Sequence, residues 1–333
     1  MWFTELTGVE EKSYKQVQDS FSLFGNLLAS KANGKCWSVG DFNVTCLQHL
    51  LNDAKQSEGN GEIKVKNIVS DVQDLHRDPK NDTALFQVAS QFNCLEMINE
   101  DYTPEDGLNL YSDDPTQGPA CAISAGAATI YRNYFLNSES VKKGQTAEKQ
   151  IDTLSAFHKK LCGIFGENLW EMKNGYLFIT EENLKKVNSK INKFNNQKRD
   201  KVKGTIRYGF LMNADVTLYG SENKVSQFFC SALPVSYNKI RDKSLWQPFA
   251  RLILEAAYEA TLAAAVINSN PLNDNSNKVF LTCLGLGAFG NSEQWVVDAM
   301  QMALQKFKNY DLEVFIVHYR NAPRRFENLA NNF

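Results

Sequence analysis

The sequence predicts an α/β fold, with a three-layer α/β/α core around a mixed central sheet. Strand-like segments rich in β-branched and aromatic residues alternate with helical segments along most of the chain. A helix expected over 246–267 is apolar nearly all round, so other elements must cover it on several sides. With 333 residues and 43% hydrophobic content, the chain can also bury a large core.

The elements are expected in a simple order. A helix over 13–31 comes first, and a strand rich in β-formers follows at 83–89. A helix of small residues, which allow close packing, begins after Pro119. The composition then turns to Lys, Asn, Gln and Glu, which predicts a solvated helical insertion with one strand-like element at 175–179. Further strands are expected at 205–211, 225–230, 279–284 and 312–318, with helices at 246–267 and after Asn291.

The chain is expected to have four parts, of which the change in composition marks only the helical insertion. Residues 1–65 form an N-terminal accessory segment, and 136–202 form the helical insertion. The core comprises 66–135 and 203–320, and residues 321–333 are a C-terminal tail.

Composition also indicates what the protein does not bind. A formal net charge of −2 argues against general attraction to nucleic acid or to anionic membranes. The longest apolar stretch, around 260–267, is far shorter than the roughly 20 residues of a membrane span, and the N-terminus lacks the pattern of a signal peptide. Seven cysteines without C-x-x-C pairs suit reduced thiols in a cytoplasmic protein. The four histidines show no metal-ligand spacing, so we expect no metal site. We also expect no cofactor.

A glycine-rich loop follows the strand at 279–284. Glycines at positions 285, 287 and 290 let backbone N–H groups approach an anion, and the next helix turns its free N-terminal donors toward it. Asn291 suits the helix N-cap, with Gln294 at the capping-box position. Strand, glycines, cap and helix together favour a phosphate cradle over a tight turn that binds nothing.

The spacing Gly285, Gly287, Gly290 is also that of dinucleotide-binding dehydrogenases. Such a site needs an acidic residue at the C-terminal end of the next strand, whereas Asp311 and Glu313 stand at its beginning. Only 43 residues follow Gly290, which is too few for the rest of a doubly wound nucleotide domain. An NAD-dependent oxidoreductase is therefore the less favoured alternative.

A second loop of functional character follows the strand at 83–89. Carboxylates cluster in it between Glu96 and Asp114, near Asn93, Gln117 and Gly118. Such residues can supply a proton donor and hydrogen-bond partners for ribose hydroxyls. A loop of about thirty residues in a compact domain favours a functional role.

Together the two loops resemble the macrodomain family. The run Cys283 to Asn291 is similar to the G-x-G-A-F-G-G/N loop of poly(ADP-ribose) glycohydrolases, and the segment from Asn93 resembles the macrodomain loop that begins with asparagine after the first core strand. The segments 106–122 and 131–134 resemble a branch of macrodomain hydrolases that act on ADP-ribosylated arginine. The resemblance implies a macrodomain-like core that binds ADP-ribose.

Two departures refine what the resemblance implies. The chain lacks the triple glycine and paired glutamates of poly(ADP-ribose) glycohydrolases, which favours a mono-ADP-ribose bond over the polymer. Residues 68–72 resemble the G-D-I-T segment whose aspartate contacts adenine, with Ser70 in place of glycine and Asp71 as the matching aspartate.

The resemblance implies a hydrolase that removes mono-ADP-ribose from arginine side chains of a protein substrate. A non-catalytic ADP-ribose-binding module and a poly(ADP-ribose) glycohydrolase remain as alternatives. Asp106 and Asp114 are the expected catalytic carboxylates, with Glu96 and Asp113 in reserve. Arg132 is expected to pair with a carboxylate in a structural role. The ADP-ribose-binding residues are expected to be Asp71, Asn93, Tyr111, Gln117, Gly118, Gly285, Gly287, Ala288, Phe289, Gly290 and Asn291.

Overall fold

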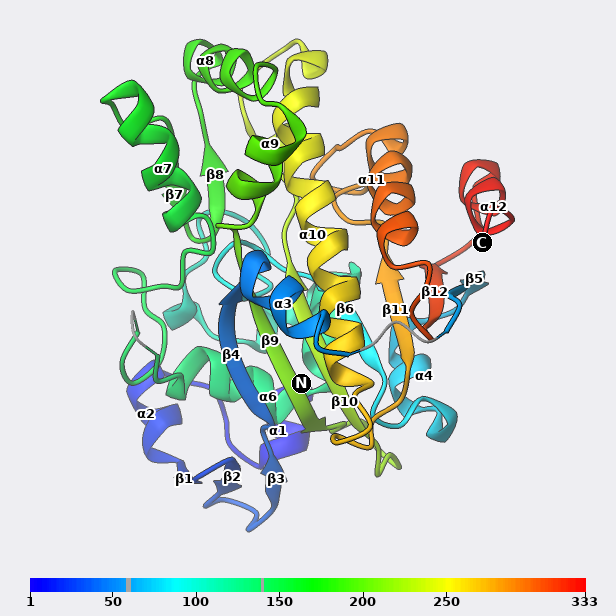
Figure 1. Ribbon diagram of the computed structural model, residues 1–333. Coiled ribbons are helices and arrows are strands. Elements are labelled where there is room, and N and C mark those ends of the chain that lie inside the picture. The colour runs from blue at the N-terminus through cyan, green and yellow to red at the C-terminus, as the bar shows by residue number, and fades with distance from the viewer. Residues whose placement is uncertain (58–60, 139–140) are drawn as a thin grey trace.

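The computed structural model describes residues 1–57, 61–138 and 141–333, and its centre is a seven-stranded sheet (Figure 1). In sheet order the strands are β4 (Asp41–Cys46), β9 (Arg207–Asp215), β10 (Lys224–Cys230), β6 (Leu85–Ala89), β11 (Lys278–Thr282), β12 (Glu313–His318) and β5 (Lys64–Val69). β10, β6, β11, β12 and β5 run parallel to one another, whereas β9 runs antiparallel to β10 and to β4. The sheet is therefore mixed, as predicted.

Helices cover both faces of this sheet (Figure 1). Successive side chains of a strand point to opposite faces. In β6, Leu85 enters the core on one face, whereas Phe86 and Val88 enter the core on the other. The predicted three-layer α/β/α class is confirmed. The first core is covered by α3 (Leu47–Ala54), α10 (Gln247–Asn268) and α11 (Glu293–Lys306), and the second by α4 (Val72–Arg77), α5 (Gln117–Ser124) and α6 (Gly126–Ile130).

The remaining elements flank this core. A small sheet at the N-terminal end holds β1 (Phe21–Phe24), β2 (Leu27–Ser30) and β3 (Cys36–Ser38), preceded by α1 (Trp2–Thr7) and α2 (Tyr14–Asp19). A π-helical turn, Tyr131–Phe135, follows α6. The inserted region holds α7 (Ser155–Phe165), the hairpin of β7 (Glu171–Lys173) and β8 (Tyr176–Phe178), α8 (Glu181–Ile191) and α9 (Asn196–Lys203), and α12 (Arg324–Ala330) lies near the C-terminus.

Several element predictions are confirmed and others are wrong. The long apolar helix is α10, most of whose residues are buried. The helix expected over 13–31 is wrong, because α2 ends at Asp19 and a hairpin turns at Gly25, whose φ of +58° favours glycine. The single strand expected in the insertion is one half of the β7–β8 hairpin. β4 and β5 were not predicted, and β4 lies within the segment 1–65 that we expected to be accessory.

We expect His76 to make the fold less stable in acid. The His76 ring is buried and stacked on Phe86 with 3.8 Å between centroids, and burial lowers its pKa from 6.5 to about 4 although the Val72 carbonyl accepts from Nδ1. Because folding lowers the pKa of His76, the buried neutral ring contributes stability that is fully present above pH 6.5. This contribution is lost as the pH falls through about 4, where the folded protein also takes up the proton. The loss should approach roughly 3 kcal/mol. Urea unfolding at several pH values between 4 and 7 would measure this loss. The free energy of unfolding should fall more steeply with decreasing pH in the wild type than in His76→Leu, and equal slopes would contradict this prediction.

Candidate active site

A cavity of about 460 Å³ lies at the edge of the sheet where the parallel strands end. Its wall contains residues that follow β5, β6, β10, β11 and β12, among them Asp71, Ser90, Ala232, Gly285 and Tyr319. Because parallel strands end at the same edge, five loops that are distant in sequence converge there. This is the edge at which the glycine-rich loop was expected to lie.

The glycine-rich loop owes its shape to two of its glycines. Gly285 has φ +73° and Gly290 has φ +71°, a region that favours glycine. A Cβ on Gly285 would lie 2.4 Å from the Ala232 Cβ, and one on Gly290 would lie 2.0 Å from the Ser236 Oγ. Gly287 has no atom within 4 Å of its Cβ position. The loop therefore packs tightly at both ends and is open at its middle.

The open middle of this loop presents free backbone donors to the cavity. Leu286 N–H bonds the Cys283 carbonyl, and Gly290 N–H bonds the Gly287 carbonyl. Within the described ranges, no protein acceptor receives a hydrogen bond from the N–H groups of residues 285, 287, 288 and 289. Gly285, Gly287, Ala288 and Phe289 all line the cavity. Consecutive free N–H groups of this kind can bind an anion.

Asn291 serves the loop in a way that the sequence did not indicate. The N-cap of α11 is Ser292, and the side chain of Gln294 donates to Asp298, so both the predicted cap and its capping box are wrong. The Asn291 side-chain amide instead donates to the Leu233 carbonyl at 2.9 Å and to the Gly285 carbonyl at 3.3 Å. Asn291 is buried and, like Gly290, lies outside the cavity wall. It ties the glycine loop to the segment after β10.

Three of the candidate acidic residues line the cavity, and they are Asp71, Glu96 and Asp114. Asp114 is half-buried, and its Oδ1 accepts from the Thr116 N–H at 2.8 Å. Asp71 is exposed, and its Oδ1 accepts from the Gln73 N–H at 2.7 Å, which caps α4. Each of these two carboxylates is thus held by a backbone donor through one oxygen. In the described part of the chain, no protein donor bonds the second oxygen of either carboxylate.

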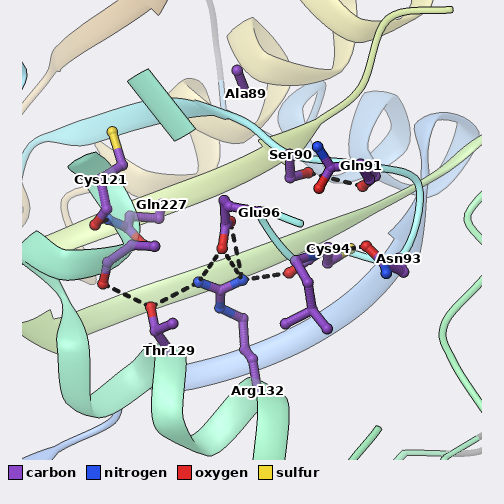
Figure 2. A network of polar contacts seen from close by, with 12 residues as sticks. Ala89, Ser90, Gln91, Asn93, Cys94, Glu96, Cys121, Thr129, Arg132 and Gln227 are labelled. Atoms are coloured by element: carbon purple, nitrogen blue, oxygen red, sulfur yellow. Dashed lines mark hydrogen bonds and ion pairs between the residues drawn. The ribbon is translucent and has the colours of Figure 1, made fainter. Parts of the chain in front are cut away.

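Glu96 borders the cavity, but its carboxylate is turned into the protein. It lies on the Arg132 guanidinium, with 3.2 Å between Oε1 and Nη1, and both side chains are completely buried (Figure 2). Arg132 also donates to the Cys94 carbonyl and to Thr129 Oγ1, and it stacks over the Phe229 ring at 4.0 Å. Burial raises the pKa of Glu96 to about 7, although Arg132 opposes this rise. The expected structural pairing of Arg132 is confirmed, and Glu96 is its partner.

Four other predicted residues lie away from the cavity wall. Asp106 Oδ2 accepts from the N–H and hydroxyl of Thr103, both at 2.8 Å, and so caps its own turn. Asp113 is exposed on the outer side of the same loop. Asn93 is buried; its Oδ1 accepts from Leu95 N–H and its Nδ2 donates to the Gln150 side chain. The Tyr111 hydroxyl accepts from Glu96 N–H at 3.1 Å. None of these four residues lines the cavity.

Gln117 and Gly118 hold the first helix after this loop against the sheet. Gln117 lines the cavity, but its amide accepts from Ala89 N–H at 2.9 Å and donates to the Gln87 carbonyl at 2.8 Å. A Cβ on Gly118 would lie 2.0 Å from the Ala89 carbonyl oxygen. Both residues therefore serve the close packing of α5 on β6, and the amide of Gln117 is occupied by backbone groups rather than free for ribose hydroxyls.

An aromatic wall that the sequence did not reveal closes one end of the cavity. Tyr176 of β8, Tyr237 and Phe289 all line it, with ring centroids 5.0 to 5.5 Å apart. Burial raises the pKa of Tyr176, and the charges of Tyr237, Glu100 and Asp114 raise it further. The three rings come from distant segments, and no local pattern could have linked them.

Neither membrane spans nor metal clusters emerge from the described ranges. No helix in them is long and apolar enough to cross a membrane. No group of three or more His, Cys, Asp or Glu side chains in them could hold a metal ion.

No protein-family model and no curated protein sequence matches the chain. Among solved structures, it is similar to poly(ADP-ribose) glycohydrolase from Deinococcus radiodurans in complex with ADP-ribose, at 10% identity and a TM-score of 0.46, over 87% of this chain and 94% of that one. It is also similar to poly(ADP-ribose) glycohydrolase from Thermomonospora curvata, at 11% identity and a TM-score of 0.45, over 96% of each chain. At these values the likeness assigns neither a substrate nor a reaction to this chain.

Proposed function

We propose that this protein is a hydrolase that releases mono-ADP-ribose from arginine side chains of proteins. The observation that carries the proposal is the set of free N–H groups at positions 285, 287, 288 and 289 in the wall of the cavity. Such donors suit the two adjacent phosphates of ADP-ribose. The macrodomain-like motif around the same glycines supports the assignment of ADP-ribose over other anions.

The rest of the cavity suits the two ends of ADP-ribose. Its volume of about 460 Å³ lies within the usual range for small-molecule sites. Phe289, Tyr176 and Tyr237 offer an apolar wall for the distal ribose, beside Asp114. Asp71 lies on the loop after β5 and also lines the cavity. Its macrodomain-like motif assigns it to the adenine end of ADP-ribose.

Asp114 is then the residue that assists cleavage of the C1–N bond. The electron pair of this bond passes to the guanidino nitrogen while a water oxygen bonds C1, and the carboxylate accepts the proton of that water. The released guanidine takes up this proton, because arginine is always protonated in water. A carboxylate near C1 also favours the positive charge that develops there and the cationic arginine of the substrate.

A non-catalytic ADP-ribose-binding module is the second candidate. The observation that favours it is the burial of Glu96 against Arg132, which leaves Asp114 as the one predicted catalytic carboxylate in the described cavity wall with an oxygen free. A module would bind ADP-ribose and leave the arginine bond intact. We also propose a cytoplasmic location, which the seven free cysteine thiols support.

Gly287→Glu should weaken ADP-ribose binding by at least about tenfold in calorimetry, because its carboxylate would stand beside the bound diphosphate. Gly163→Glu is the matched control, since Gly163 on α7 also has open space around it. NAD should bind more weakly than ADP-ribose to the wild type. Absence of ADP-ribose binding by the wild type would overturn the proposed function. Equal affinity of Gly287→Glu and Gly163→Glu for ADP-ribose would show that the glycine loop is not part of the binding site.

A further inference from the structure

Three polar side chains from neighbouring strands form a hydrogen-bonded chain that begins in the wall of the cavity. Cys283 directly follows β11, His318 ends β12 and Asn67 lies on β5, and these strands are adjacent in the sheet. Cys283 Sγ lies 3.9 Å from His318 Nδ1, and His318 Nε2 lies 2.8 Å from Asn67 Oδ1. Cys283 and His318 both line the cavity. Neither the glycine loop nor Asp114 uses these groups.

The direction of each hydrogen bond in this chain is fixed by a backbone carbonyl. Asn67 Nδ2 donates to the Phe326 carbonyl oxygen at 2.9 Å, and a carbonyl oxygen can only accept. Asn67 Oδ1 must therefore face His318, so the histidine carries its proton on Nε2. The lone pair of His318 Nδ1 is then directed at the Cys283 thiol. The Phe326 ring packs edge-on against the His318 ring, with centroids 5.2 Å apart, and limits its rotation.

The thiol in this arrangement needs a base, and the imidazole is in the state to serve as one. Burial raises the pKa of Cys283 to about 12, with a further contribution from Glu293, so the thiol is protonated near neutral pH. Burial also lowers the pKa of His318, which is therefore neutral under the same conditions. Both shifts favour the neutral thiol and imidazole over thiolate and imidazolium, so the proton has to pass to Nδ1 as the thiol attacks. What resembles nucleophilic cysteine centres is the geometry, an imidazole oriented by an amide beside a thiol.

We propose that Cys283, His318 and Asn67 form a nucleophilic thiol site that adds covalently to neutral α,β-unsaturated carbonyl compounds entering the cavity. Sγ forms a bond to the β-carbon as its proton passes to His318 Nδ1. The electron pair of the C=C bond moves to the α-carbon, which then takes the proton from Nδ1. The overall reaction adds S–H across the C=C bond and gives one thioether. It releases no leaving group and needs no oxidant. Because Cys283 lies two residues before Gly285, the adduct would lie against the glycine loop.

N-ethylmaleimide, a neutral compound of this class, tests the proposal on the full-length protein. Peptide mass spectrometry would measure the labelling rate of Cys283 and, in the same molecule, of the exposed Cys36. We expect Cys283 to be labelled, although more slowly than Cys36, because its thiol is less exposed and its pKa is raised. His318→Phe should slow Cys283 at least about tenfold and leave Cys36 unchanged. His49→Phe, at an exposed position on α3, is the matched control and should change neither rate.

Asn67 variants separate orientation of the base from simple packing. Asn67→Leu, which cannot hold the histidine tautomer, should slow Cys283, whereas Asn67→Asp keeps an oxygen opposite Nε2 and should retain most of the rate. An unreactive Cys283 in the wild type, or one that His318→Phe does not slow, would overturn the proposal. If His318→Phe fails to fold, the wild-type rate and the two Asn67 variants decide. None of these measurements needs ADP-ribose, so they test the thiol site separately from the proposed hydrolase.

Discussion

Asp114→Asn is expected to lower kcat for release of ADP-ribose from ADP-ribosylated arginine by about 10²- to 10⁴-fold, the usual contribution of a general base. Asparagine retains an oxygen that can accept from Thr116 N–H, as the Asp114 carboxylate does at 2.8 Å, so the loop should keep its shape. The variant loses only the negative charge and the ability to take a proton. The measurement is single-turnover release of ADP-ribose, with ADP-ribose affinity determined in parallel.

Asp113→Asn is the matched control, because the neighbouring carboxylate is exposed and lies outside the cavity wall. It should retain wild-type turnover, and Asp106→Asn should do so as well, since that carboxylate only caps its own turn. Loss of turnover in Asp114→Asn with affinity retained would separate a hydrolase from a binding module. Equal turnover in the wild type and Asp114→Asn would remove Asp114 from the catalytic role.

The second large effect is expected in the buried ion pair beneath the cavity. Arg132→Met should lower the free energy of unfolding by about 3–5 kcal/mol, because it leaves Glu96 buried without its charged partner. Urea unfolding would measure the loss. Glu96→Leu combined with Arg132→Met should be less destabilised than Arg132→Met alone, since no uncompensated charge then remains.

An exposed ion pair provides the control for this prediction. Arg77 Nη1 lies 2.8 Å from Asp74 Oδ1 on α4, and both side chains are substantially solvated. Arg77→Met should therefore cost less than about 1 kcal/mol. A similar loss in Arg77→Met and Arg132→Met would mean that burial of the pair contributes nothing particular to the fold.

The sequence predicted best where neighbouring residues act together. The glycine loop was predicted because strand, glycines and helix follow one another within a few positions. The helix α10 was predicted to be buried because its neighbouring residues are apolar nearly all round. β4 and β5 were not predicted because they lie at the two edges of the sheet and are only partly buried, so their hydrophobic pattern is weak. The cap at Asn291 was misplaced by one residue because its amide bonds across to Leu233.

The site required more than local pattern. Glu96, Asp106, Asp113 and Asp114 lie on one loop and have the same carboxylate chemistry. Only the folded chain turns Glu96 inward to Arg132, turns Asp106 back to Thr103 and leaves Asp114 in the cavity wall. The aromatic wall and the chain of Cys283, His318 and Asn67 likewise join strands and loops that are far apart in sequence.

By itself, the sequence determined the layered α/β class and the glycine loop at the end of a core strand. Both follow from hydrophobic periodicity and from glycine's access to positive φ, which act over a few neighbouring residues. Tertiary structure decided which carboxylate faces the cavity, which aromatic rings close it and which histidine nitrogen faces a thiol. These features depend on parallel strands that end at one edge and on hydrogen bonds between distant segments, and such contacts form only when the chain folds.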